Sequence, residues 1–187
     1  MINVNTLKPG TTFSDGDDIF VVLSASHSKQ GRGQANVKAK VKNLRTGSTV
    51  VKSYTGGDKV GPAHIDKIDM DYLYSDGQNI VLMDQKTYEQ IEIPVTKVEW
   101  EINFLKEGNK DLVRKFGNEV LDVELPINIE LEVTTAPEAV KGNTQSNPQK
   151  KIILETGFEI EAPMFIKEGE TIVVSSETGK YVGRGNK

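Results

Sequence analysis

Short strand-like runs separated by turn residues recur along this chain, and they limit its fold more than any other feature of the sequence. The runs are rich in apolar and β-branched residues and lie at 19–25, 35–44, 49–54, 68–74, 79–83, 88–93, 120–125, 127–133, 151–155 and 171–175. Turn sequences such as Asp15-Gly16 and Ser75-Asp76-Gly77 stand between them, as in the hairpins of small barrels. The sequence therefore predicts a mostly β protein.

One segment, 95–106, interrupts this pattern. Its apolar residues recur near helical spacing, and it runs into Glu107-Gly108, which can end a helix. A short helix here fits a five-stranded Greek-key barrel with an inserted helix. Trp100 within it could serve as a platform for a stacked base, but a lone Trp in an amphipathic helix more often fills a core. We treat Trp100 as structural.

Composition favours several small domains over one large one. Only 6% of the 187 residues are aromatic, and 17 glycines and 7 prolines interrupt the apolar runs. Boundary-like sequences lie at 55–62 and at 134–149, although the second is equally compatible with a loop of the last barrel. We expect domains at 1–63, 64–126 and 127–187. Domains of about 60 residues are marginal alone, so at least one firm contact between them is expected.

Positive charge is concentrated in the first third of a chain whose net charge is −4. Residues 27–59 carry eight Lys or Arg against one Asp, whereas residues 60–187 carry 14 against 23 Asp or Glu. Because salt screens charges beyond about 8 Å, acidic domains further away would barely cancel this basic region. The distribution is typical of a local nucleic-acid contact.

A loop with one arginine between two glycines opens this basic region. Gly31 and Gly33 allow a tight turn, which would place Arg32 at the tip with little bulk on either side. Lysines then alternate with apolar residues, and those on one face of the predicted strand are Lys38, Lys40 and Lys42. Their spacing is about 6.6 Å. The pattern predicts a finger that contacts RNA; a solvated or aggregation-guarding face explains the lysines alone equally well.

Several other classes of chemistry lack their residues in this sequence. The chain has no cysteine, which excludes disulfides and thiol chemistry. Its histidines, His27 and His64, have no carboxylates at metal-ligand spacing, and no hydrolase elbow or complete phosphate-binding glycine loop is present. We expect no enzyme activity, metal or cofactor. Without a signal peptide or an apolar run of membrane length, we expect a soluble cytoplasmic protein.

Nearly the whole chain resembles the bacterial translation elongation factor P family. The residues that carry the resemblance, in this order and spacing, are Leu7-Lys8-Pro9-Gly10, the tip 31–35, 41–47, Tyr72-Leu73-Tyr74 and the block from 154 to 184. The resemblance implies an L-shaped, tRNA-like monomer with an N-terminal KOW or SH3-like barrel and two OB-type barrels. Such a factor binds the ribosome beside peptidyl-tRNA and, without catalytic residues, stimulates peptide-bond formation at consecutive prolines.

The resemblance also implies which residues make contacts. Those expected at tRNA or rRNA are Lys29, Gly31, Arg32, Gly33, Gln34, Lys38, Lys40, Lys42, Arg45, Tyr181 and Arg184. Tyr181 and Arg184 are equally compatible with the end of a strand and its salt bridges. The loop that approaches the codon in the family corresponds to Gly142, Asn143 and Thr144, where the family has Asp in the middle position.

The tip departs from the family's pattern. The lysine type of the family has Pro-Gly-Lys-Gly-Gln-Ala, whereas this chain places Arg32 in that frame. A modifying enzyme acting on Arg32 is one possible partner: the side chain could be rhamnosylated, otherwise modified or used bare, and β-lysylation is disfavoured because it needs lysine. The alternative function is that of a generic OB-fold protein that binds single-stranded nucleic acid with aromatic platforms.

Overall fold

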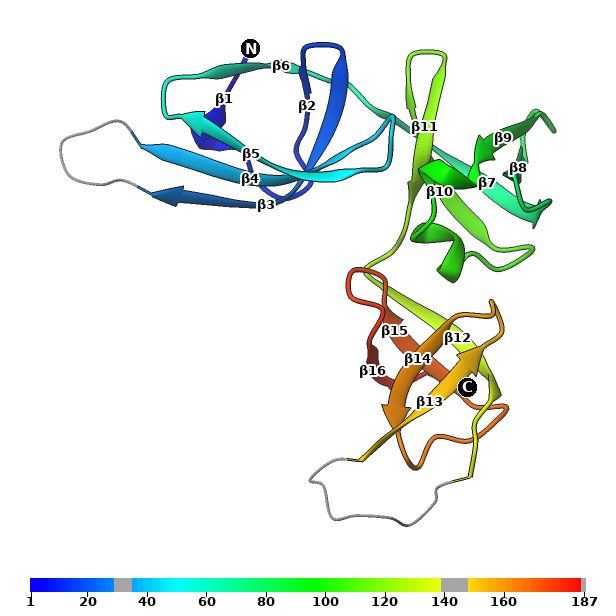
Figure 1. Cartoon of the computed structure of the whole chain (residues 1–187). Coiled ribbons are helices and arrows are strands. Elements are labelled where there is room, and N and C mark those ends of the chain that lie inside the picture. Colours follow the sequence, from blue (N-terminus) through cyan, green and yellow to red (C-terminus); the bar gives the residue numbers. More distant parts are fainter. Residues whose placement is uncertain (29–34, 139–147, 186–187) are drawn as a thin grey trace.

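The computed structural model describes residues 1–28, 35–138 and 148–185, and it contains three antiparallel sheets. Each sheet curls into a barrel, and Figure 1 shows the N-terminal and C-terminal barrels extending from the central one in an L. The sheets take their strands from 2–62, 66–124 and 128–184, and the expected boundaries at 63/64 and 126/127 lie in the connections between them. The prediction of an all-β fold is confirmed.

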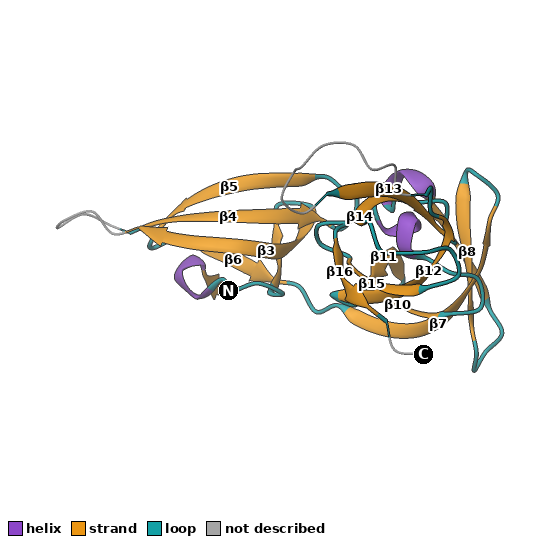
Figure 2. Cartoon of the chain, turned by 90° about the horizontal axis from the view of Figure 1, so that it is seen from below, coloured by secondary structure: helices purple, strands orange, loops and turns teal. Residues whose placement is uncertain are grey.

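The N-terminal sheet has six strands in the order β1-β6-β2-β3-β4-β5. Their bounds are β1 Ile2–Asn3, β2 Thr12–Asp15, β3 Asp18–Ser28, β4 Asn36–Asn43, β5 Thr49–Thr55 and β6 Lys59–Pro62, with a 3₁₀ helix, η1, at Val4–Thr6. Alternate residues of β4 are fully buried in the barrel core. Figure 2 shows β3, β4 and β5 side by side along this limb of the molecule.

The central and C-terminal sheets share one strand order. The central strands are β7 Asp66–Ser75, β8 Asn79–Asp84, β9 Gln90–Pro94, β10 Lys110–Phe116 and β11 Glu119–Glu124. The C-terminal strands are β12 Asn128–Thr135, β13 Gln149–Leu154, β14 Glu159–Pro163, β15 Thr171–Ser175 and β16 Tyr181–Arg184. In each sheet the first strand is central, with the second and third on one side and the fourth and fifth on the other, so both follow the same five-stranded Greek-key plan.

The short helix predicted within 95–106 takes the form of two 3₁₀ helices and not of one amphipathic helix. They are η2 at Val95–Lys97 and η3 at Glu101–Phe104. Val98 ends the first with φ −130° and ψ 30°, outside the helical region. The apolar side chains of this segment serve two cores, because Val98 packs in the central barrel and Phe104 in the C-terminal one. A single amphipathic helix would present them to one core only.

Two joints connect the barrels, which confirms the expectation of a firm contact. At the first, residues from the N-terminal barrel, the connection and β11 form one buried apolar cluster: Ile19, Val21, Leu44, Ala63 and Leu121. At the second, the Trp100 ring packs against Phe104 and Phe158, and its Nε1 donates to the carbonyl of Ser176 at 2.5 Å. Trp100 is therefore structural, as predicted. Within the described residues, no helix is long and apolar enough to span a membrane.

Candidate nucleic-acid interface

Part of the predicted interface lies outside the described residues. This applies to the tip and to the codon-proximal loop, namely Lys29, Gly31, Arg32, Gly33, Gln34, Gly142, Asn143 and Thr144. Their roles stay predictions. The structure does place the strands on either side of the tip, because β3 and β4 pair as far as Ser28 and Asn36. That end of the hairpin is the one further from the central barrel (Figure 1).

Lys38 and Lys40 project from the outward face of β4, as the alternation predicts. Both are exposed, and the residues between and beside them on the strand are fully buried. Uncharged residues of β3 and β5 flank the two lysines, namely Ser24, Ser26, Val51 and Ser53. Neither ammonium makes an ion pair with the part of the chain that the structure describes. The two charges are thus available to an anionic partner.

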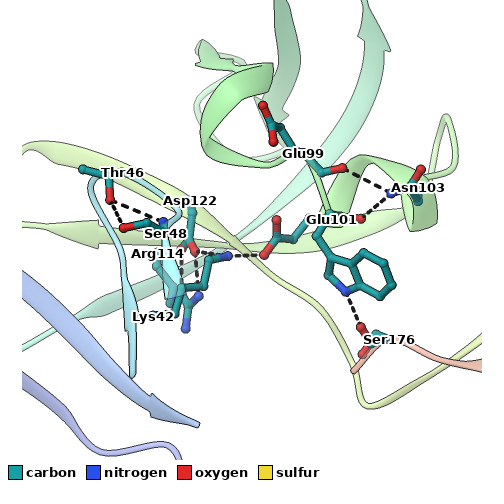
Figure 3. A network of polar contacts seen from close by, with 10 residues as sticks. Lys42, Thr46, Ser48, Glu99, Glu101, Asn103, Arg114, Asp122 and Ser176 are labelled. Atoms are coloured by element: carbon teal, nitrogen blue, oxygen red, sulfur yellow. Dashed lines mark hydrogen bonds and ion pairs between the residues drawn. The ribbon is translucent and has the colours of Figure 1, made fainter. Parts of the chain in front are cut away.

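Lys42, the third lysine of the row, has a different environment. Its side chain is only 12% exposed, and its ammonium contacts the carboxylates of Glu101 and Asp122, with 3.2 Å between Nζ and Asp122 Oδ2. Both acids belong to the central barrel, on η3 and β11. Figure 3 shows Lys42 reaching toward them across the joint. The row predicted from the alternation therefore divides into two available charges and one engaged charge.

A buried arginine completes the network around Lys42. Arg114 on β10 donates from Nε and Nη2 to the two carboxylate oxygens of Asp122, each at 2.7 Å. Asp122 is fully buried. Burial is the largest single influence and lowers the pKa of Arg114, but the hydrogen bond to Asp122 and the charges of the nearby acids together outweigh it, and the net pKa is raised. Arg114 and Lys42 together balance Glu101 and Asp122, which is how buried charge is tolerated.

Arg45 makes a second ionic contact across the same joint. Its guanidinium donates to both carboxylate oxygens of Glu119, with 2.8 Å between Nη2 and Oε2, and to the backbone carbonyl of Asp17. The hydrogen bond to Glu119 raises the pKa of Arg45. Both side chains are about one-third exposed, so this pair lies at the rim. Arg45 thus also engages the central barrel.

Tyr181 and Arg184 lie on β16 in the C-terminal barrel, on the other limb from the lysines (Figure 1). Tyr181 packs against the C-terminal core. The Arg184 guanidinium lies 4.9 Å from the centre of the Phe165 ring, and its Nε is 3.4 Å from Glu170 Oε2. The alternative reading, that these residues finish a strand and its salt bridge, describes this geometry. Their predicted tRNA contacts stay predictions.

Sequence reasoning did not identify the acids that engage Lys42 and Arg45. The available signal was in β10 and β11, where Arg114 and Asp122 interrupt apolar runs at positions that a strand buries. A positive and a negative residue at buried positions of neighbouring strands indicate a buried ion pair. No group of three His, Cys, Asp or Glu that could hold a metal occurs among the described residues, and His27 and His64 are exposed.

Comparisons with known proteins found family models, sequence relatives and solved structures that are similar to this chain. Three family models match in order: a KOW-like domain of elongation factor P at residues 3–60, its OB domain at 65–123 and its C-terminal domain at 129–184. The elongation factor P of Mycoplasmopsis pulmonis is 73% identical over 187 residues, covering all of both chains, and that of Mycoplasma mobile is 69% identical over 186 residues, covering 100% of this chain and 99% of that one. The eukaryotic translation initiation factor 5A structure from Methanococcus jannaschii is 22% identical, covers 66% of this chain and 92% of its own, and has a TM-score of 0.49.

Proposed function

We propose that this chain acts in peptide-bond formation. The chain belongs to the elongation factor P family. It is therefore a translation elongation factor and not an enzyme. Membership implies association with the ribosome. Beyond that, we propose that the protein binds beside peptidyl-tRNA and relieves stalling at consecutive prolines. The observation that carries this proposal is the pair of exposed, unengaged lysines, Lys38 and Lys40, on the hairpin that leads to the tip.

The proposed contact divides its tasks between the hairpin and the tip. Lys38 and Lys40 would neutralise phosphates of the tRNA backbone, which supplies affinity without sequence preference. Arg32 would reach the acceptor end, since a planar guanidinium stacks on bases and pairs with phosphates in bidentate geometry. Gly142, Asn143 and Thr144, which belong to the loop between β12 and β13, would lie near the codon. The protein acts in the cytoplasm as a monomer in this proposal.

Orientation of the tRNA is the proposed source of the rate gain. Proline reacts poorly because its ring fixes φ and restricts the preceding residue. A factor that holds the end of peptidyl-tRNA in a productive position lowers the entropic part of the barrier, and such positioning contributes up to about 7 to 11 kcal/mol in favourable cases. The reacting groups remain those of the ribosome and its tRNAs.

Synthesis of a Pro-Pro-Pro peptide on purified ribosomes tests this proposal. The wild-type protein should raise the rate, and Arg32→Ala should lose most of the gain. Lys86→Ala, which removes one exposed positive charge from the turn between β8 and β9, should keep it. Tight binding to free single-stranded RNA with no effect on this synthesis would favour the generic single-strand binder instead.

The state of Arg32 can be determined separately. The intact mass of the protein purified from its native host, followed by the mass of the peptide that contains Arg32, distinguishes a bare arginine from a modified one. A mass increment on that peptide would identify a partner enzyme's chemistry. An unmodified mass together with full activity would show that the bare guanidinium suffices.

A further inference from the structure

We propose that Lys42 is a positioning residue that fixes the N-terminal barrel against the central barrel, and not an RNA contact. This inference rests on the proposed function above, because it concerns where the tip points. Lys42 belongs to the same alternating row as Lys40, so a sequence pattern assigns both lysines one role. In the structure the two lysines differ in their contacts, because the Lys42 ammonium contacts two carboxylates and the Lys40 ammonium makes no ion pair with the described residues.

The ammonium of Lys42 is held from two sides by the central barrel. Glu101 approaches from η3 and Asp122 from β11, and the side chains of both are at most 10% exposed. To bind an RNA phosphate, the Lys42 ammonium would have to leave Glu101 and Asp122. Glu101 would then have no cation beside it, and Asp122 would keep only Arg114. Uncompensated buried carboxylates are strongly unfavourable. Lys40, two residues away on the same face, faces no such cost.

Contacts around Lys42 resist both sliding and rotation of the joint. The apolar cluster of Ile19, Leu44 and Leu121 gives the two barrels a common core but sets no direction. The Arg45 pair with Glu119 adds a second ionic contact at the rim. Gly47 lies so close to the backbone of Lys97 that an added Cβ would stand 2.8 Å from its carbonyl oxygen. With Lys42, these contacts define one orientation.

A small rotation at this joint would be amplified at the tip. Lys42 lies at the end of β4 nearest the central barrel, and Asn36 lies at the end nearest the tip. Six residues of strand span about 20 Å, which is the lever arm from Lys42 to Asn36, the residue of β4 nearest the tip in the sequence. Catalysis by positioning is sensitive to displacements on the order of 1 Å. The orientation of the joint is therefore a requirement for the proposed action of Arg32.

A double-mutant cycle across the joint tests this role. Lys42→Met removes the ammonium and keeps a similar length, and Glu101→Leu removes its partner. The double variant leaves Arg114 and Asp122 as a balanced pair, so Glu101→Leu should restore most of the Pro-Pro-Pro synthesis that Lys42→Met loses. We expect a coupling of about tenfold in rate. Lys40→Met is the matched control, and Glu101→Leu should not rescue it.

Two further measurements distinguish positioning from RNA contact. A lysine that neutralises a phosphate contributes about 1 to the slope of log affinity against log salt, so ribosome binding by Lys40→Met should show a shallower slope and Lys42→Met an unchanged one. Because the chain has no cysteine, dyes at Lys59→Cys and Lys86→Cys report the barrel-to-barrel distance in the free protein. Lys42→Met should broaden that distance distribution, and Lys40→Met should not.

The outcomes separate the two proposals. A shallower salt slope for Lys42→Met, no rescue by Glu101→Leu, or an unchanged distance distribution would overturn the positioning role. If the wild-type protein fails to stimulate Pro-Pro-Pro synthesis, the proposed function fails, but the distance measurement on the free protein still decides whether Lys42 sets the joint. Circular dichroism of each variant shows whether the barrels remain folded.

Discussion

The joint between the N-terminal and central barrels is ionic at its centre, whereas the joint between the central and C-terminal barrels is aromatic. In the first, Lys42 meets Glu101 and Asp122 beside a small apolar cluster. In the second, the rings of Trp100, Phe104 and Phe158 pack edge to face, with centroids 5.3 to 5.8 Å apart. Apolar burial is non-directional, but charge pairs require a particular geometry. The aromatic joint is thus suited to cohesion and the ionic joint to orientation.

The aromatic joint is also where one barrel supplies part of another's core. Phe104 belongs to η3 of the central segment, yet it is 3% exposed inside the C-terminal core. Gly179 approaches so closely that an added Cβ would stand 2.9 Å from the Trp100 ring. Thr156 donates its hydroxyl to the carbonyl of Asn103 at 2.7 Å beside them. Removing one of these rings should therefore destabilise the C-terminal barrel itself.

Phe104→Ala is expected to have the largest effect on stability. Truncating a buried Phe costs about 3 to 5 kcal/mol, which should lower the urea midpoint of the C-terminal barrel. Trp100 is the only tryptophan and touches Phe104, so its fluorescence reports this joint directly. Phe116→Ala is the control, since Phe116 is 37% exposed and should cost much less. Equal losses for the two variants would contradict a shared core.

Two buried carboxylates of the central sheet, Asp122 and Asp111, differ in whether they have hydrogen-bond partners. Asp122 accepts two hydrogen bonds from Arg114, whereas Asp111 on the same sheet has a buried Oδ2 without a partner among the described residues. Burial, and then the nearby charge of Asp71, raises the pKa of Asp111 to about 6. Asp122→Asn should therefore destabilise the protein at pH 7, by about 2 to 3 kcal/mol, and Asp111→Asn should stabilise it, by about 1 to 2 kcal/mol.

The change of protein stability with pH tests whether the charged form of Asp111 destabilises the fold. Because its pKa is higher in the folded protein than its ordinary value of 3.8, the folded form binds the proton more tightly. The stability that comes with that proton is complete below pH 3.8 and is lost as the pH rises through about 6. The gain from Asp111→Asn should thus be seen at pH 7 and vanish near pH 4. A gain that is the same at both values would assign it to packing.

The sequence predicted the fold better than it predicted the site. Each predicted strand-like run overlaps a strand, with differences of one to three residues at some ends, because alternation and turn residues are local signals. Strands that were missed had weak or contrary patterns: β6 lies in a run rich in Gly and Pro, and β10 buries Asp111 and Arg114. The helical spacing of apolar residues at 95–106 predicted a short helix but not its division into two 3₁₀ helices, because the sequence does not show that these residues serve two different cores.

The row of lysines shows the same limit at the candidate site. Alternation correctly placed Lys38, Lys40 and Lys42 on the outward face of one strand. It could not show that the central barrel covers only the end of that face. Burial by another domain depends on contacts between residues far apart in the sequence, here Lys42 with Glu101 and Asp122. Local patterns therefore predict which face of a strand a side chain lies on, but not which residues of another domain it contacts.

Arg45→Ala is expected to have the smallest effect on stability, and it separates the rim of the ionic joint from its centre. The Arg45 and Glu119 side chains are 32% and 38% exposed, and exposed ion pairs contribute about 0.2 to 1 kcal/mol. Urea unfolding at low salt should show a loss in that range. Near 1 M salt, where screening acts over about 3 Å, the loss should disappear.

The buried pairs around Asp122 should behave differently under the same conditions, because Asp122 is fully buried, its partners are at most 12% exposed, and buried pairs are screened much less by salt. The destabilisation by Asp122→Asn should therefore persist at high salt while that of Arg45→Ala is lost. If salt removes both losses equally, the network around Lys42 is screened by solvent. It would then be too weakly held to set an orientation, and the contrast between an orienting and a cohesive joint would fail.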